Sequence, residues 1–187
     1  MEEQIGRRFG SDDFKEGDFS DSVFEDCEFS HCDLKKLNFE RVRWIGCKFI
    51  SCDLSNLKLS GARLRDVTFQ NCKMIGIQWV RLMDLVSPSF SDCNLNYSNF
   101  NGLKLKKTEF YRCSLRDSDF SQADLTESNF MESDLLNARF SGTILLKGDF
   151  RGARNYLIDP ISNKVKGSKF SLPEAQGLLA GLGVVVE

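Results

Sequence analysis

The sequence is poor in the residues on which most enzymes and metal sites depend. It holds a single histidine, His31, and none of its seven cysteines forms a CxxC pair. Metal sites and nucleophile–base pairs draw on closely spaced His, Cys and carboxylate side chains, and the sequence shows neither such a set nor a phosphate-binding glycine loop. We therefore expect no enzyme activity, no cofactor and no metal.

Long apolar runs are absent as well. No stretch approaches the roughly 20 apolar residues of a transmembrane helix, and the first residues, MEEQIGRRFGSDDF, contain no apolar secretory core. Free cysteines persist in reducing compartments, and seven of them favour such a location. These features predict a cytoplasmic protein with no membrane segment.

Charge of either sign is nearly balanced overall, with a net charge of −2, but it is banded along the chain. Residues 1–33 carry eleven acids and three bases, residues 34–81 ten bases and three acids, and residues 117–150 seven acids and two bases. No exposed aromatic is expected among the bases of the middle band, although single-stranded nucleic acids favour such stacking surfaces. We therefore expect no direct nucleic-acid binding.

What the sequence does have is an apolar residue at every fifth position, which we call the grid. The grid runs from Phe9 to Trp79, resumes after one inserted residue at Leu85, and continues through Phe150 to Phe170. All sixteen phenylalanines lie on the grid, and all seven cysteines lie two residues before a grid residue. Neither an α-helix nor a flat strand returns to one face every five residues, so the chain must turn between grid positions.

A square coil with one pentapeptide on each side satisfies this spacing. Twenty residues then close one coil, all grid side chains point inward, and about eight coils stacked at about 4.8 Å form a rod about 40 Å long. Between Leu85 and Phe150, leucine and phenylalanine alternate strictly. The core residues predicted from this alternation are Phe90, Phe100, Phe110, Phe120, Phe130, Phe140, Phe150, Leu95, Leu105, Leu115, Leu125 and Leu135.

Small residues should fill the second inward position, two residues before the grid. Five cysteines share one column there, and we interpret them as small buried apolar groups in preference to a metal ladder or a redox relay. These are Cys32, Cys52, Cys72, Cys93 and Cys113.

Segments such as CDLSN, SDFSQADLTESNF and SDLLNARF are similar to the A(D/N)LXX consensus of the pentapeptide-repeat family. The resemblance covers about residues 9–170. It implies an all-β solenoid, specifically a right-handed quadrilateral parallel β-helix with a short C-terminal helix and strand.

Within that family, the length of the rod and the C-terminal GVVVE segment look most like the quinolone-resistance and microcin-immunity proteins. This resemblance implies a homodimeric DNA mimic that binds DNA gyrase or topoisomerase IV and protects the enzyme from quinolone-type or peptide inhibitors. The alternative is a general protein-interaction scaffold with no topoisomerase role.

The chain divides into a lead-in over residues 1–8, the solenoid over 9–170 and a C-terminal module over 171–187. The inserted residue falls within 80–84, where a bulge could be a neutral irregularity or a contact feature. The last coil, 151–170, is degenerate because Asn155 and Pro160 occupy grid positions. The module should cap the solenoid and form a dimer. Its predicted dimerisation residues are Leu178, Leu179, Leu182, Val184, Val185 and Val186.

Two groups of acids are candidates for binding a protein partner. One is predicted to stack on the surface of the first coils, and the other belongs to the acidic band over residues 117–134. The candidates are Asp13, Asp33, Asp53, Asp117, Asp119 and Asp134.

Overall fold

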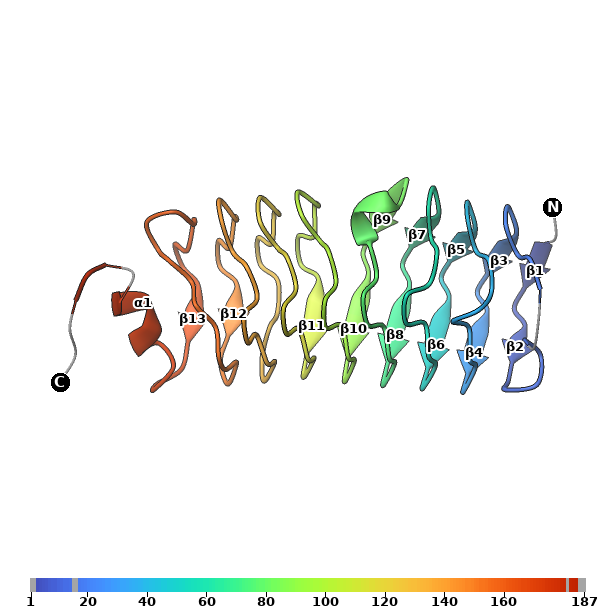
Figure 1. The fold of residues 1–187 in the computed structure, drawn as a ribbon, viewed down its shortest axis with the longest axis horizontal. Helices are drawn as coiled ribbons and strands as arrows, with labels where there is room; N and C mark the ends of the chain where they lie inside the picture. The colour runs from blue at the N-terminus through green and yellow to red at the C-terminus, as the bar shows by residue number, and fades with distance from the viewer. Residues whose placement is uncertain (1–2, 15–16, 181, 185–187) are drawn as a thin grey trace.

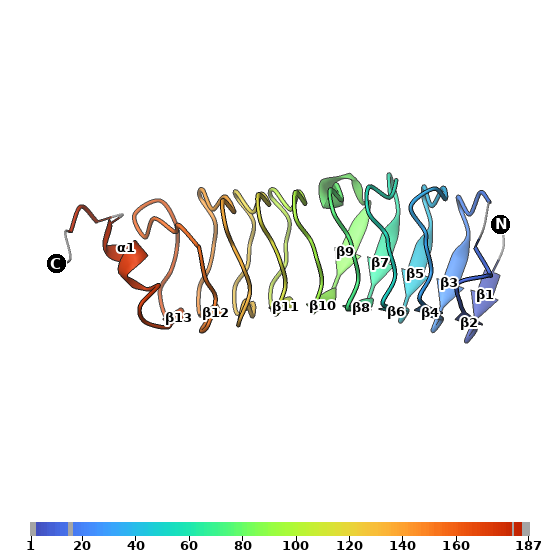
Figure 2. The same cartoon turned by 60° about the horizontal axis from the view of Figure 1, so that its bottom comes forward.

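A computed structural model describes residues 3–14, 17–180 and 182–184. The chain forms a parallel β-solenoid, a rod with β1 at one end and α1 at the other (Figures 1 and 2). Paired residues are twenty apart, as in Phe29 with Phe49, and twenty-one apart across the insertion, as in Phe69 with Phe90. The predicted fold class is confirmed, with about eight coils.

Strands are only two or three residues long, because each side of a coil is one pentapeptide. One sheet contains β1 (Glu3–Ile5), β3 (Val23–Glu25), β5 (Arg43–Ile45), β7 (Arg63–Arg65) and β9 (Asp84–Val86). A second contains β2 (Arg8–Phe9), β4 (Glu28–Ser30), β6 (Lys48–Ile50), β8 (Thr68–Gln70), β10 (Ser89–Ser91) and β11 (Glu109–Tyr111). The remaining elements are β12 (Asp149–Phe150), β13 (Lys169–Phe170), the 3-10 turn η1 (Trp79–Arg81) and α1 (Gln176–Ala180).

Stacked aromatic rings fill the interior. One column, with neighbouring ring centroids 4.5–5.3 Å apart, consists of Phe9, Phe29, Phe49, Phe69, Phe90, Phe110, Phe130, Phe150 and Phe170. The opposite column meets it edge-on, as where Phe110 and Phe120 lie 5.6 Å apart. All twelve core residues predicted from the leucine–phenylalanine alternation are buried. The grid therefore points inward as expected.

Most corners are tight turns whose key residue lies two positions after the grid. At one such corner the carbonyl of Phe120 accepts a hydrogen bond from the N–H of Ala123 at 3.1 Å, and Gln122 has φ of 60°. A positive φ at the third residue of the turn is the mark of a type II turn. Polar residues occupy this left-handed position more often than glycine does, and their side chains project into solvent.

The first and last coils differ from the prediction. The lead-in is part of the solenoid, because β1 pairs with β3 and places Gln4 opposite Phe24. Because Gln4 is polar, the apolar pattern does not extend to this position, and the sequence did not indicate the first coil. In the last coil Tyr156 and Ile158, which lie off the grid, are buried in place of Asn155 and Pro160.

The C-terminal module contains a short helix. Helix α1 begins at Gln176, after turns over residues 172–175. Ser171 precedes these turns, and its hydroxyl oxygen accepts a hydrogen bond from the N–H of Gly152 at 3.1 Å. Val184 is not in a strand, and Val185 and Val186 lie outside the described residues.

The inserted residue is accommodated by η1 and a bulge, as Figure 1 shows beside β9. The N–H groups of Met83 and Asp84 both approach the carbonyl of Ala62, at 2.8 and 3.4 Å. Two residues opposite one is the arrangement of a β-bulge. Val80 and Met83 are exposed at this point, so the insertion directs apolar side chains outward.

Candidate protein-binding surface

The six candidate acids occupy very different environments. Asp13, Asp33 and Asp117 are exposed. The side chain of Asp53 is 22% exposed and that of Asp119 is 18% exposed. The predicted stack is present in part, since Asp33 pairs with Asp53 on the next coil. Asp13 instead lies in a turn, where it accepts a hydrogen bond from the N–H of Gly10 at 2.6 Å.

Asp134 is buried, so the prediction that it contacts a partner is wrong. Its side chain is only 3% exposed and lies 2.7 Å from Nη2 of Arg116. Asn155 donates a further hydrogen bond to it at 2.9 Å. The irregular last coil brings Asn155 over this carboxylate, which the regular spacing could not indicate. Asp134 thus joins coils together and has no free oxygen face for a partner.

Several of these acids also form the corners of the solenoid. Their carboxylates accept the N–H of the residue two positions later, as Asp53 does from Ser55 at 3.0 Å and Asp119 from Ser121 at 2.9 Å. This Asx turn recurs with asparagine, for example from Asn101 to Asn99 at 3.0 Å. The repeated Asp or Asn just before grid residues was the signal for this role, and the sequence prediction missed it.

Opposite charges pair between neighbouring coils. Arg41 and Asp21 lie 2.6 Å apart, Arg112 and Asp92 2.7 Å, and Arg139 and Asp119 2.8 Å. The hydrogen bond from the Arg41 guanidinium lowers the pKa of Asp21 below its ordinary value. Such pairing breaks up the acidic bands, because many carboxylates already face a cation on the next coil.

The cysteines are packing residues. All seven are free and buried, and the thiol of Cys52, for example, donates to the carbonyl of Phe29 at 3.3 Å. Burial raises the pKa of the Cys47 thiol to about 12, so this group is protonated and unreactive at neutral pH. In the part of the chain that the structure describes, no group of three or more His, Cys, Asp or Glu residues could hold a metal ion. Within the same residues, no helix is long and apolar enough to span a membrane.

Apolar side chains gather at the C-terminal end of the rod. Leu157, Ile161 and Leu172 are among the most exposed large apolar residues of the described chain. Of the predicted dimerisation residues, Leu179, Leu182 and Val184 are exposed, whereas Leu178 is partly buried against the core. The end of the solenoid therefore presents more apolar surface than its own coils cover.

The family model for the pentapeptide repeat region matches residues 22–85 and 82–150. The chain belongs to the pentapeptide-repeat family. No curated protein sequence matches this pentapeptide-repeat protein.

Solved structures of QnrB1, a plasmid-mediated fluoroquinolone resistance protein, resemble it along their whole length. One trypsin-treated variant has 17% identity and a TM-score of 0.63, with 100% of this chain and 98% of that chain covered. The full-length QnrB1 structure has 20% identity and a TM-score of 0.55, with 97% of each chain covered. HetL from the cyanobacterium Nostoc has 17% identity and a TM-score of 0.45, with 89% and 84% covered. At 17–20% identity the likeness to QnrB1 shows the fold alone.

Proposed function

We propose that this pentapeptide-repeat protein is a non-enzymatic rod that binds a type II topoisomerase, DNA gyrase or topoisomerase IV. Binding would protect the enzyme from quinolone-type or peptide inhibitors. The end-to-end match with QnrB1, over 100% of this chain and 98% of that one, supports the proposal. A rigid rod with acidic corners can occupy a surface that an enzyme builds for the phosphates of duplex DNA.

The proposed contacts are the candidate acids that reach solvent, namely Asp13, Asp33 and Asp117. Asp33 begins a column of residues, paired by parallel β-bridges from one coil to the next, that runs on to Asp134. Asp117 lies at the left-handed corner that comes just after this column in the chain. Cations reduce the negative potential of Asp33, Asp53 and Asp119, because Lys35 lies 3.3 Å from the first and 3.1 Å from the second, and Arg139 lies 2.8 Å from the third. Mimicry of DNA would thus rest on a few acids.

A homodimer through the C-terminal module belongs to the same proposal. Leu172, Leu179 and Leu182 are exposed at the end of the rod. An apolar cluster on a soluble surface usually marks a contact, and two-fold dimers are the commonest oligomers. Pairing two rods end to end would double the length of the surface offered to a topoisomerase.

Binding to immobilised gyrase tests the role of the exposed acids. The double variant Asp33→Asn, Asp117→Asn removes two charges and keeps an oxygen acceptor at both positions, so the turns survive. We expect weaker binding and a smaller dependence on salt, since exposed charges are screened within about 8–10 Å at physiological ionic strength. Asp66→Asn, an exposed corner acid in another column, is the matched control and should bind as the wild type does. Equal binding by all three proteins would contradict the acidic contact.

A general protein-interaction scaffold is the second candidate. The pairing of charges between coils favours it, because a DNA mimic needs carboxylates that are not already neutralised. A scaffold without a topoisomerase role would leave gyrase and topoisomerase IV unchanged, with or without an inhibitor.

A further inference from the structure

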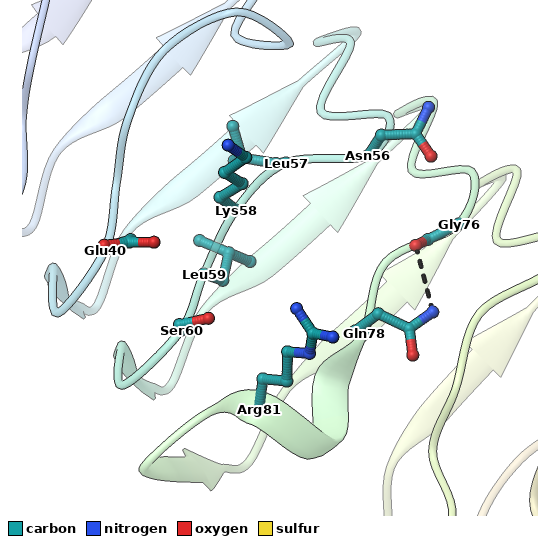
Figure 3. A pocket seen from close by; sticks show the side chains of 9 residues that line it. All are labelled: Glu40, Asn56, Leu57, Lys58, Leu59, Ser60, Gly76, Gln78 and Arg81. Carbon is teal, nitrogen blue, oxygen red and sulfur yellow. Dashed lines mark hydrogen bonds between the residues drawn. The ribbon is translucent and has the colours of Figure 1, made fainter.

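A polar groove crosses three consecutive coils between Lys35 and Arg81. It consists of two adjoining hollows of about 380 and 450 Å³, which share Glu40, Asn56 and Lys58. Figure 3 shows the first hollow, with Lys58 on one coil and Arg81 and Gln78 on the next. Space of this size suits a small molecule or a short peptide segment.

Small residues at the corners keep the groove open. Gly76 has φ of 74°, and a Cβ added there would lie 2.5 Å from Oδ1 of Asn56. Ser60 lines the same hollow, and the neighbouring corner residue is Gly61, with φ of 71°. The sides of the groove are therefore formed by Lys58, Gln78 and Arg81, whose polar ends can reach into it.

The two cations of the first hollow, Lys58 and Arg81, lack the aspartate partner that pairs with arginines at other corners. Arginines at other corners pair with the aspartate twenty residues earlier, as Arg41 does with Asp21 at 2.6 Å. For Arg81 the residue at that distance is Gly61, which offers no carboxylate. A parallel β-bridge pairs Lys58 with Asn38 on the preceding coil, and Gln78 occupies the same position on the following coil. Both of these neighbours are uncharged. Neither cation has an ion pair with any residue that the structure describes.

The inserted residue explains how Arg81 reaches this place. At Arg41 and Gly61 the corner is left-handed, but at Arg81 the chain forms the 3-10 turn η1 instead. The carbonyl of Arg81 still accepts the N–H of Gly61 at 2.9 Å, so the backbone ladder is kept. In Figure 3 the side chain extends from η1 toward Gln78. The insertion thus directs an unpaired guanidinium into the groove.

We propose that this groove binds an acidic segment of a protein partner, with carboxylates on Lys58 and Arg81. The only acid lining either hollow is Glu40, and it lies 3.9 Å from Arg41. No aromatic side chain lines the groove, so nucleobases would find no stacking surface there. Amide groups of Asn56 and Gln78 add donors for the backbone or carboxylates of the segment. The inference does not depend on a topoisomerase partner.

Fluorescence anisotropy with a fluorescein-labelled hexaglutamate peptide tests the proposal on the full chain. We expect Lys58→Gln, Arg81→Gln to weaken binding about 3- to 30-fold, the range for losing two exposed charge contacts. Lys104→Gln, Lys166→Gln removes two exposed lysines elsewhere and should leave the affinity unchanged. Equal weakening by both double variants would overturn the groove as the site.

A second pair of variants separates charge from shape. Gly61→Asp places a carboxylate at the corner one coil before Arg81, whose carbonyl accepts the N–H of residue 61, and should weaken hexaglutamate binding by neutralising the guanidinium. Gly61→Asn tolerates the same left-handed backbone without a charge and should bind as the wild type does. Thermal unfolding checks that both variants fold. Equal affinity of the two, or tighter binding of a labelled oligo-dT than of hexaglutamate, would overturn the proposal.

Discussion

Single side chains in this protein have environments set by their place in the pentapeptide. Phe120 is fully buried, with stacked rings of Phe100 and Phe140 at 4.9 and 5.3 Å on the neighbouring coils. Asn101, only one position after a grid residue, is exposed at a corner. Truncation of the two side chains should therefore have very different effects on stability.

Phe120→Ala tests the inward grid at this scale. We expect a loss of about 3–5 kcal/mol in the free energy of unfolding, because the two adjacent rings and the backbone ladders cannot close the cavity. Asn101→Ala should cost much less, since its backbone N–H, and not its side chain, bonds to Asn99. Denaturant unfolding measures both. Equal stability of Phe120→Ala and the wild type would contradict the inward orientation.

The stability of the corners should depend on pH through their aspartates. The hydrogen bond from the Arg151 guanidinium lowers the pKa of Asp149. A lowered folded-state pKa stabilises the protein above the unfolded pKa of about 3.9 and ceases to do so as the pH falls below it. Asp149→Asn should therefore be less stable than the wild type at pH 7, and the difference should shrink between about pH 4 and pH 2. A difference that stays constant in urea unfolding down to pH 2 would count against this ion pair.

Among the elements, the coils close on themselves and the C-terminal module does not. Helix α1 has five residues, and Leu179 within it is exposed. The β12–β13 pair and the stacked rings of Phe150 and Phe170, 5.1 Å apart, already complete the last coil. Each coil thus buries its own grid residues, whereas the C-terminal module leaves apolar side chains exposed.

Deleting residues 171–187 should give a folded monomer. The truncated chain keeps Phe170 and every coil before it, so circular dichroism should show the solenoid unchanged. Light scattering should report a dimer for the full-length protein and a monomer for the truncated one, because Leu172, Leu179 and Leu182 are removed. A full-length protein that is monomeric at micromolar concentration would refute the dimer.

The sequence predicts the regular coils well and the irregular ones poorly, for a physical reason. Period five fixes Phe90 and Leu95 as inward because no other geometry buries them all. It cannot show that Gln4 begins the first coil, nor that Tyr156 and Ile158 leave the register to fill the last one. Asp134 was misassigned for a similar reason, since its burial depends on Asn155 and Arg116 in three dimensions.

The whole molecule is a rod whose long surface carries alternating charges. Its rigidity comes from ladders and ring stacks that run from Phe9 to Phe170. Asp117 and Asp33 remain exposed on this surface, but Asp33 lies 3.3 Å from Lys35, and the less exposed Asp53 and Asp119 also face cations. A partner would therefore recognise a mixed pattern of charge on a rod of fixed length.

A gyrase supercoiling assay with purified full-length protein, with and without a fluoroquinolone, tests the central claim most directly. The account predicts that the protein restores supercoiling in the presence of the drug. It also predicts less restoration by Asp33→Asn, Asp117→Asn than by Asp66→Asn. If the wild-type protein changes the activity of neither gyrase nor topoisomerase IV, whether or not the drug is present, topoisomerase protection is contradicted.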